Sequence, residues 1–186
     1  MSMKTVLHVE FSQTGELLSE EYIKKDIPEP ELSSIKETKT KEISSACNQT
    51  IEAGTAVTIS DGSEKHFTYS LLDQSNISEM FNALIGGATE YLYHADGEEY
   101  MMYSAKDIVI IYSTLSMFKT GQIMYQNQLK QYINSLTDKT VIQSVQYGDA
   151  LIGEYLTKYN ELMAQAQTQM NKVLANITIS NHSLAE

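Results

Sequence analysis

The side chains best suited to metal chemistry lie in one short segment of the sequence. His94, Asp96, Glu98 and Glu99 carry imidazole and carboxylate groups, the usual protein ligands of zinc and calcium. All four fall in or beside a single predicted tight turn, and no second cluster of ligands accompanies them. Metal sites need ligands that converge from separate elements, so the pattern favours a solvated turn. We expect no metal ion and no cofactor.

His66 and Cys47 are the remaining candidates for catalysis. His66 lies in a predicted strand, with Glu64 nearby but no serine or cysteine nucleophile arranged around it. Cys47 lies on a predicted helix face and is interpreted as a small core residue, because free cysteines are usually buried. The sequence has no HExxH motif, and Gly86-Gly87 is not followed by the Gly-Lys-Ser/Thr of a phosphate-binding loop. We therefore expect a protein that is not an enzyme.

The composition excludes several other classes of protein. The 186 residues include 13 Lys and Arg against 24 Asp and Glu, a net charge of −11. Such an acidic chain is poorly suited to binding nucleic-acid phosphates or an anionic membrane surface. No apolar run approaches the roughly 18 residues of a membrane-spanning helix, and the N-terminus lacks the apolar region of a signal peptide. We expect folding in a cytoplasm, without membrane insertion and without a nucleic-acid partner.

The spacing of apolar, turn and capping residues predicts a mainly helical α+β fold in three parts. Residues 1–30 form an N-terminal β-hairpin and a linker, in which Pro28 and Pro30 favour extended backbone. Residues 31–148 form a helical domain whose helices are interleaved with two short β-hairpins. Residues 149–186 form a long C-terminal helix, similar to a coiled-coil helix, and a polar tail.

Local signals place the first half of the central domain. A helix begins near Ser33 or Ser34 and ends at Gly54. A hairpin over residues 55–70 follows, for which Asp61-Gly62 predicts a two-residue turn with a positive φ at Gly62. The alternating residues predicted to form its buried face are Val57, Ile59, Phe67 and Tyr69.

Capping signals place the second half of the domain. Asp73 or Ser75 caps a short helix that ends at Gly86-Gly87, and a second hairpin over residues 88–103 turns at residues 95–98. Ser104 and Asp107 resemble a capping box at the start of a helix that runs to about Leu136. A short segment capped at Thr137-Asp138 then reaches about Tyr147.

The C-terminal helix carries an apolar seam in alternating steps of four and three residues. Its members are Ile152, Leu156, Tyr159, Met163, Ala166, Met170, Val173 and Ile177. Such a seam predicts a coiled coil or a helix docked along a groove. We interpret it as a surface for association between copies of the chain. The alternative is an intramolecular helical hairpin, in which the chain's own helix 104–136 covers the seam. The residues assigned to the interface are Leu156, Tyr159, Met163, Ala166, Met170 and Val173.

Five short motifs mark the central domain. They are Lys39-x-Lys41-Glu42-Ile43-x-x-Ala46-Cys47-x-x-x-Ile51-x-x-Gly54, Ile59-Ser60-Asp61-Gly62-x-x-x-His66-Phe67, Asp73-Gln74-x-Asn76-Ile77, Tyr93-His94-Ala95-Asp96-Gly97-Glu98 and Tyr103-Ser104-Ala105-x-Asp107. Through these motifs, residues 35–147 resemble a domain-of-unknown-function family that is widespread in tailed bacteriophages and prophages. Many members have a tryptophan in the second hairpin, where this chain has tyrosines.

The resemblance implies a place in a phage tail rather than a defined activity, because the motifs are structural. We expect a structural or adaptor component of a phage tail, or of a phage-tail-like particle, at the baseplate or the tail fibre. Its partners are then other tail proteins and further copies of itself, with a trimer favoured by the tail-fibre setting, and its location is the virion tail. The alternative is a cytoplasmic chaperone of tail-fibre assembly that is not retained in the virion. A host-wall hydrolase is disfavoured by the missing catalytic motifs.

Overall fold

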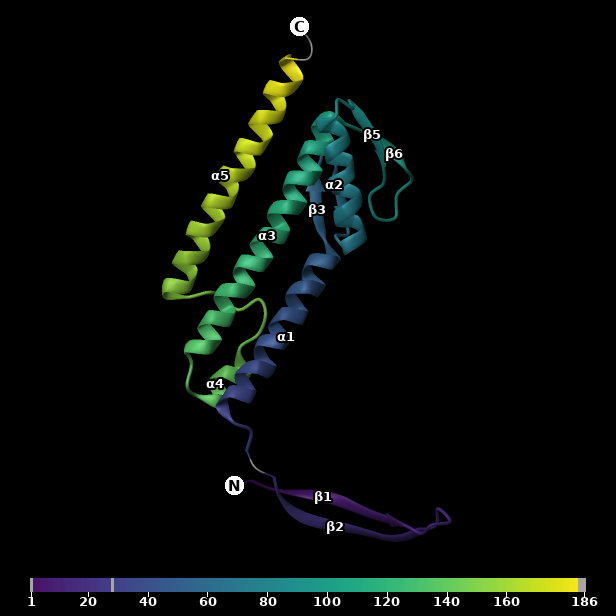
Figure 1. Ribbon diagram of the computed structural model, residues 1–186, viewed down its shortest axis with the longest axis vertical. Coiled ribbons are helices and arrows are strands. Elements are labelled where there is room, and N and C mark those ends of the chain that lie inside the picture. Colours follow the sequence, from purple (N-terminus) through teal and green to yellow (C-terminus); the bar gives the residue numbers. More distant parts are fainter. Residues whose placement is uncertain (1, 28, 184–186) are drawn as a thin grey trace.

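A computed structural model describes the backbone of residues 2–27 and 29–183 and the side chains of residues 7–17 and 29–177. It shows an elongated helical body with a β-hairpin that extends away from one end (Figure 1). The elements are β1 (Ser2–Phe11), β2 (Leu17–Ile27), α1 (Leu32–Ala53), β3 (Thr55–Thr58), β4 (Glu64–Phe67), α2 (Leu71–Ile85), β5 (Glu90–Tyr93), β6 (Met101–Ser104), α3 (Ala105–Ser135), α4 (Lys139–Ser144) and α5 (Gly153–Ser183). The predicted α+β class, mainly helical with short hairpins and a long C-terminal helix, is confirmed.

Helices α1 and α3 lie side by side and antiparallel along the body (Figure 1). Near the start of α1, Lys36 Nζ donates to the backbone oxygen of Asn134 (2.6 Å), whereas Cys47, near its end, donates to that of Gln122 (3.4 Å). Both helices contribute to two apolar cores. Their buried contributions to the first core are Cys47, Ile51, Ile108, Ile111 and Leu115. Those to the second are Ile35, Ile43, Leu129 and Ile133, joined there by Ile142 of α4.

Gly54 ends α1 where the sequence predicts, and it also admits the first hairpin. Its φ is +76°, and its N–H donates to the backbone oxygen of Ile51 at 3.0 Å. A Cβ atom at this position would overlap the backbone carbonyl of Phe67 in β4. The glycine is therefore required twice, by its left-handed backbone and by the close approach of a second element.

The hairpin β3–β4 has the predicted buried face but not the predicted turn. Val57, Ile59, Phe67 and Tyr69 are all buried. The backbone N–H of Ile59 donates to the oxygen of Ser63 (2.9 Å), so the loop has three residues, 60–62, and the prediction of a two-residue turn was wrong. Gly62 has the predicted positive φ, +90°, as expected for a three-residue loop that closes with a glycine bulge.

Two other local predictions are corrected by the structure. The N-cap of α2 is Ser70 rather than Asp73 or Ser75, and Asp73 is the third residue of a capping box with Ser70. The register of β5–β6 pairs Tyr93 with Met101, so seven residues, 94–100, connect the strands. The predicted turn at residues 95–98 lies inside this loop, where the Glu98 N–H donates to the Ala95 oxygen (3.1 Å).

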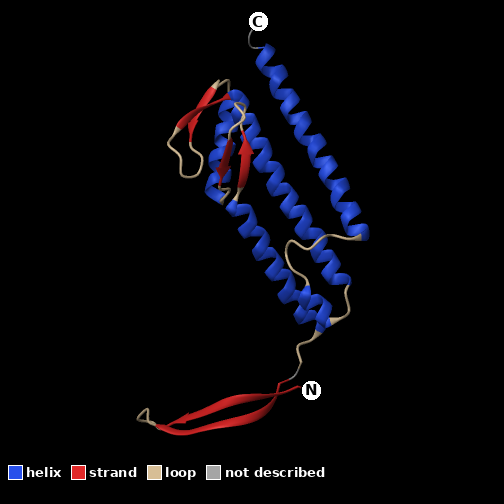
Figure 2. Ribbon diagram, turned by 180° about the vertical axis from the view of Figure 1, so that it is seen from behind, coloured by secondary structure: helices blue, strands red, loops and turns tan. Residues whose placement is uncertain are grey.

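Helix α2 and the two short hairpins cover one end of the α1–α3 pair (Figure 2). Phe81 of α2 stacks on Tyr112 of α3, with ring centroids 3.7 Å apart. In the hairpins, Phe67 meets Tyr103 edge to face at 6.1 Å. Aromatic side chains therefore join this part of the structure to α3.

Asp107 connects the start of α3 to both hairpins. The predicted capping box is present: the Ser104 hydroxyl accepts from the Asp107 N–H, and the carboxylate of Asp107 accepts from Ser104 N (3.2 Å) and Oγ (2.6 Å). The same carboxylate accepts from the backbone N–H of Ser60 at 2.9 Å, in the three-residue loop of β3–β4. Burial alone would raise the pKa of Asp107, but these hydrogen bonds outweigh it and hold the pKa below its ordinary value.

The opposite end of the body is closed by α4. Its cap is the predicted Asp138, whose carboxylate accepts from the N–H groups of Thr140 (2.7 Å) and Val141 (3.2 Å). The helix ends at Ser144, earlier than the predicted Tyr147, and Gly148 then takes a φ of +105°. None of the helices, over the residues described, is long and apolar enough to cross a membrane.

The first testable prediction concerns Gly54. Gly54→Ala places a side chain at positive φ and against the Phe67 carbonyl, so we expect a loss of several kcal/mol in the free energy of unfolding. The matched control is Gly97→Ala, which has a similar φ of +72° but nothing within 4 Å of the added Cβ. It should lose about 1–2 kcal/mol. Urea unfolding measures both losses, and equal losses would contradict the close approach at Gly54.

The second prediction concerns the bridge made by Asp107. Asp107→Asn should lower the free energy of unfolding by about 1–3 kcal/mol at pH 7. Because the pKa of Asp107 is lowered in the fold, this stabilisation is complete above the ordinary carboxyl pKa of about 3.9 and is lost as the pH falls through the lowered value. Urea unfolding of the parent and the variant across this range measures the difference.

The capping box of α2 supplies the control for this prediction. Asp73 occupies the same capping-box position but receives its hydrogen bonds from Ser70 alone. Asp73→Asn should therefore lower the free energy of unfolding by less than Asp107→Asn does. If the two variants lose equal stability, the contact from Ser60 to Asp107 contributes nothing, and the bridge between hairpin and helix is refuted.

Candidate functional site

Helix α5 lies along the outer side of α3 and packs mainly against that one helix (Figure 1). No side chain of its described residues 153–177 is fully buried. The half-buried ones are Tyr155, Tyr159, Leu162, Met163, Ala166, Met170, Leu174 and Ile177. Tyr155 and Tyr159 pack on the second core, and Leu174 and Ile177 on the first. The helix therefore spans both cores with one half-covered face.

The six residues assigned to an interface divide into two groups. Tyr159, Met163, Ala166 and Met170 are half-buried. Tyr159 and Met163 lie beside Gly121 of α3, where an added Cβ atom would be in ordinary van der Waals contact with both. Leu156 and Val173 are 43% and 45% exposed. The chain's own α3 therefore covers part of the seam, and association between copies stays a prediction.

Two grooves flank the contact between α3 and α5. One, of about 400 Å³, is mainly apolar and is lined by Met117, Phe118, Gly121, Gln122, Tyr125, Tyr147, Gly148, Tyr159 and Met163. The other, of about 720 Å³, is lined mostly by polar side chains: Gln128, Gln131, Asn134, Glu154, Tyr155, Thr157, Lys158 and Glu161. Because α3 covers only a narrow strip of α5, both grooves beside this contact stay open.

A cluster of tyrosines fixes the segment between α4 and α5. Tyr147 Oη donates to Gln122 Oε1 (2.6 Å), and Tyr125 Oη donates to the backbone oxygen of Asp149 (2.7 Å) while accepting from Gly148 N (2.9 Å). Burial raises the pKa of the Tyr147 hydroxyl, so it acts as a donor across the ordinary pH range. Cys47 is 1% exposed, which confirms its predicted core position. The hydrogen bonds of Tyr125 and Tyr147 hold residues 147–149, the segment that leads into α5.

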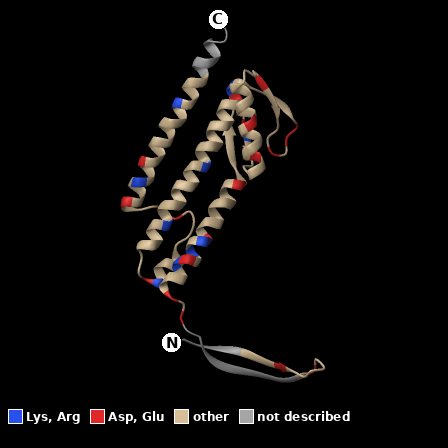
Figure 3. Cartoon of the chain, in the orientation of Figure 1, with Lys and Arg blue, Asp and Glu red and all other residues tan. Residues whose placement is uncertain are grey.

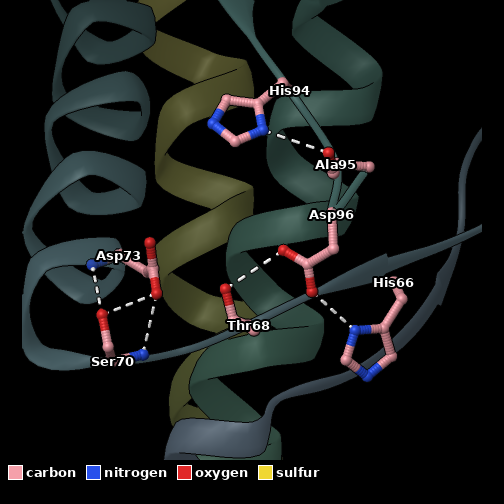
Figure 4. Close-up of polar contacts among 7 residues, drawn as sticks. All are labelled: His66, Thr68, Ser70, Asp73, His94, Ala95 and Asp96. Atoms are coloured by element: carbon pink, nitrogen blue, oxygen red, sulfur yellow. Dashed lines mark hydrogen bonds and ion pairs between the residues drawn. The ribbon is translucent and has the colours of Figure 1, made fainter. Parts of the chain in front are cut away.

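A histidine–carboxylate contact joins β4 to the β5–β6 loop (Figure 4). His66 Nδ1 lies 2.7 Å from Asp96 Oδ2, and the other carboxylate oxygen accepts from Thr68 Oγ1 (3.1 Å). The backbone N–H of Asp96 donates to the backbone oxygen of His66 (2.9 Å). An ionised carboxylate only accepts hydrogen bonds, so Nδ1 of His66 is the donor. The contact holds the loop against the hairpin β3–β4.

The other polar residues of this loop point to different partners. Lys65 forms an ion pair with Glu98, whose carboxylate holds the pKa of Lys65 above its ordinary value. His94 Nδ1 lies 3.1 Å from the backbone oxygen of Ala95, and its ring lies 4.6 Å from that of Tyr100. Among the described residues, no three His, Cys, Asp or Glu side chains are grouped to hold a metal ion.

The pair of His66 and Asp96 has the geometry in which a carboxylate orients a histidine base. A nucleophilic mechanism would also need a hydroxyl or thiol within reach of the ring. The hydroxyl of Ser70, which lies in the same region (Figure 4), instead donates to Asp73 Oδ2 (2.6 Å) in the capping box. Asp96 and His66 join the two hairpins, whereas Ser70 and Asp73 cap α2.

The contact between His66 and Asp96 was missed by the sequence analysis, which considered each residue with its neighbours in the chain. Thirty residues separate them. Neither periodicity nor capping reports a partner at that distance, because both signals act within a few residues. The docking of the β5–β6 loop on β4 creates the pair.

Charged side chains are sparse on α3 and α5 (Figure 3). Within the described part of α5 they are Glu154, Lys158, Glu161 and Lys172. Lys158 Nζ and Glu161 Oε2 form an exposed pair at 3.3 Å. The long helices therefore present mainly uncharged surfaces, which is typical of the centre of protein–protein contacts.

Comparison with protein families identifies one domain in the chain. The model of the domain of unknown function DUF4376 matches residues 34–149. These residues include most of α1, all elements from β3 to α4, and the tyrosine-held segment up to Asp149. No curated protein and no solved structure matches the chain. The chain therefore belongs to the DUF4376 family.

Proposed function

We propose that this protein is a structural or adaptor component of a phage tail, or of a phage-tail-like particle, at the baseplate or tail fibre. It acts through association with further copies of itself and with other tail proteins, and a trimer is the favoured assembly. The motif resemblance of the central domain supports the tail setting. The surfaces that the single chain leaves open support association as the mode of action.

The observation that carries the proposal is the one-sided packing of α5. A helix of 31 residues packs mainly against α3, and Leu156 and Val173 of its seam stay exposed. Exposed apolar strips on otherwise folded surfaces are characteristic of sites that bind protein. Sister copies of α5 and α3 would cover both flanks of the strip.

A role in catalysis is not part of the proposal, and neither is a cofactor. His66 and Asp96, the best-oriented acid–base pair described above, serve to dock one hairpin on the other. The alternative function, a cytoplasmic chaperone of tail-fibre assembly, uses the same association surfaces and is favoured by the net charge of −11. The two functions differ in whether the protein stays in the finished particle.

The third prediction therefore concerns purified particles. Mass spectrometry of tail-bearing particles from the encoding phage or host should detect this chain at a fixed stoichiometry to the other tail proteins. Its presence in the producing cells but absence from the particles would contradict a virion role and favour the chaperone. The known tail proteins in the same sample are the internal standard.

The fourth prediction tests association through α5. Leu156→Lys combined with Val173→Lys places two charges in the strip, at positions already exposed in the single chain. The parent should sediment as an oligomer, and this variant should sediment as a smaller species with unchanged helix content. Burying a lysine ammonium group in the contact between copies would weaken the free energy of association. Sedimentation velocity and circular dichroism measure the two properties.

The matched control is Ala164→Lys combined with Ala175→Lys, at exposed positions of α5 outside the seam. It should keep the parent's oligomeric state, since it adds the same charge without entering the strip. A parent that is monomeric at high concentration would refute the proposal. So would a control that dissociates as readily as the seam variant.

A further inference from the structure

The polar groove beside the contact between α3 and α5 contains a buried amide without a partner. Gln128 of α3 lines this groove of about 720 Å³ and is 4% exposed. Within the part of the chain whose side chains are described, its amide makes no hydrogen bond, and neither of its polar atoms is fully enclosed. Burying an amide without a hydrogen bond is costly. The fold therefore keeps a donor and an acceptor at the wall of the groove that serve no internal contact.

Two further amides continue this wall along α3. Gln131 and Asn134 follow Gln128 at intervals of three residues, so they are neighbours on the helix surface, and both line the same groove. Both are exposed, and neither side-chain amide makes a hydrogen bond to any described residue, although the backbone oxygen of Asn134 accepts from Lys36. Each amide offers two donor hydrogens and an acceptor oxygen in one plane. The α3 wall thus presents adjacent donors and acceptors in a row.

Helix α5, which lies beside α3 (Figure 1), supplies the opposite wall. Glu154, Lys158 and Glu161 follow one another at steps of four and three residues and so share one side of the helix. Lys158 Nζ lies 3.3 Å from Glu161 Oε2. Thr157 and Tyr155 complete the lining, which has no aliphatic side chain and one aromatic ring. The α5 wall therefore adds a hydroxyl, carboxylate acceptors and a single ring to the amides.

This lining disfavours three classes of ligand. A phosphate group needs free cationic donors, whereas the single lysine here is paired with Glu161. A metal ion needs grouped ligands, and no three His, Cys, Asp or Glu side chains among the described residues are grouped to hold one. The centre of a protein contact is normally apolar, with large buried anchors. A neutral, polar small molecule fits the groove better than any of these.

Sugar hydroxyl groups match the unpaired amides. A hydroxyl both donates and accepts hydrogen bonds, so two neighbouring hydroxyls can satisfy the oxygen and the nitrogen of one amide together. The less polar face of a sugar ring can also lie against an aromatic side chain such as Tyr155. The volume of the groove is within the range of about 300–1,000 Å³ that is typical of small-molecule sites.

We propose that the polar groove between α3 and α5 binds a neutral oligosaccharide. The amide of Gln128 is the buried contact at the wall of the site, and those of Gln131 and Asn134 bind along its rim. The inference goes beyond the proposed function and does not depend on association between copies.

The groove is separate from the apolar strip assigned to association. Leu156 and Met163 are seven residues apart and so lie on the same side of α5, and Met163 lines the apolar groove. Glu154, Lys158 and Glu161 lie on the side of the polar groove. Val173, the other exposed residue of the strip, is 12 residues beyond Glu161, or about 18 Å along the helix. One molecule can therefore bind a sister copy and a sugar at different surfaces.

The fifth prediction is sugar binding by the full-length chain. In calorimetric titrations with neutral trisaccharides of glucose, galactose, mannose and N-acetylglucosamine, each to about 10 mM, at least one should bind with a Kd of about 1 mM or lower. Gln128→Leu removes the buried amide and should weaken this binding about tenfold or more. Because that amide has no partner in the fold, the variant should keep or raise the midpoint of urea unfolding. A structural role for Gln128 would lower the midpoint instead.

Two further variants control for folding and for position. Gln126→Leu makes the same change on α3 at a half-buried residue outside the groove lining, so it should leave the affinity unchanged. Gln131→Ala with Asn134→Ala removes only exposed amides, so it should weaken binding without loss of stability even if Gln128→Leu fails to fold. The inference is overturned if no trisaccharide binds, if both groove variants bind like the parent, or if Gln126→Leu weakens binding as much as Gln128→Leu. Tighter binding of inorganic phosphate or of an uncharged glycine–serine peptide overturns it as well.

The remaining outcomes distinguish this inference from the proposed function. The Leu156→Lys, Val173→Lys variant should bind sugar as the parent does, whatever its oligomeric state. Binding by this variant alone would show that sister copies occupy the groove, and the inference would fail. A monomeric parent that binds sugar refutes association and supports the sugar site, whereas an oligomeric parent that binds none does the reverse.

Discussion

Helices α1 and α3 run antiparallel along the body and share both of its apolar cores. The pairing buries Ile43 and Cys47 on one helix and Leu115 and Leu129 on the other. At one end it forms the support on which α2 and the two short hairpins pack, and at the other the support for α4. Each smaller element is too short to bury its own apolar face, so its position depends on this pair of helices.

Polar contacts then fix how the small elements meet the pair. The carboxylate of Asp107 binds the β3–β4 loop through Ser60 and the end of β6 through Ser104. Asp96 attaches the β5–β6 loop to β4 through His66. Tyr147 attaches the segment after α4 to α3 through Gln122. The contacts of Asp107 and Tyr147 satisfy groups in partly buried surroundings, whereas the contact of His66 with Asp96 is exposed. All three join elements of the fold.

The body completed in this way leaves two elements with incomplete cover. The described part of the α5 seam packs mainly against α3, and the β1–β2 hairpin extends away from the body with Phe11 and Leu17 exposed. The two lie on opposite sides of the matched family domain in the sequence. A helical body with an incompletely covered element at each end would suit a protein that connects others, which is the role proposed here.

Much of this fold was predictable from local sequence because the responsible interactions act within a few residues. Hydrogen bonds to the nearest helical turn set the helix ends. Ser104 and Asp107 cap the start of α3, Asp138 caps the start of α4, and Gly54 ends α1. The alternation of apolar residues along the two strands likewise predicted the buried face that contains Val57 and Phe67. The repeating seam of α5 predicted a long helix with one apolar side.

What only the tertiary structure decided involves partners distant in the chain. The β3–β4 loop has three residues where the local Asp61-Gly62 signal indicates two, and its additional residue, Ser60, donates to Asp107, 47 positions away. His66 meets Asp96 because one loop docks on another strand. Helix α3 covers part of the α5 seam where Tyr159 and Met163 lie beside Gly121. Sequence periodicity identifies an apolar face, but the packing of the whole chain selects which surface that face contacts. The hydrophobic effect is non-directional, so many apolar surfaces could cover the same face.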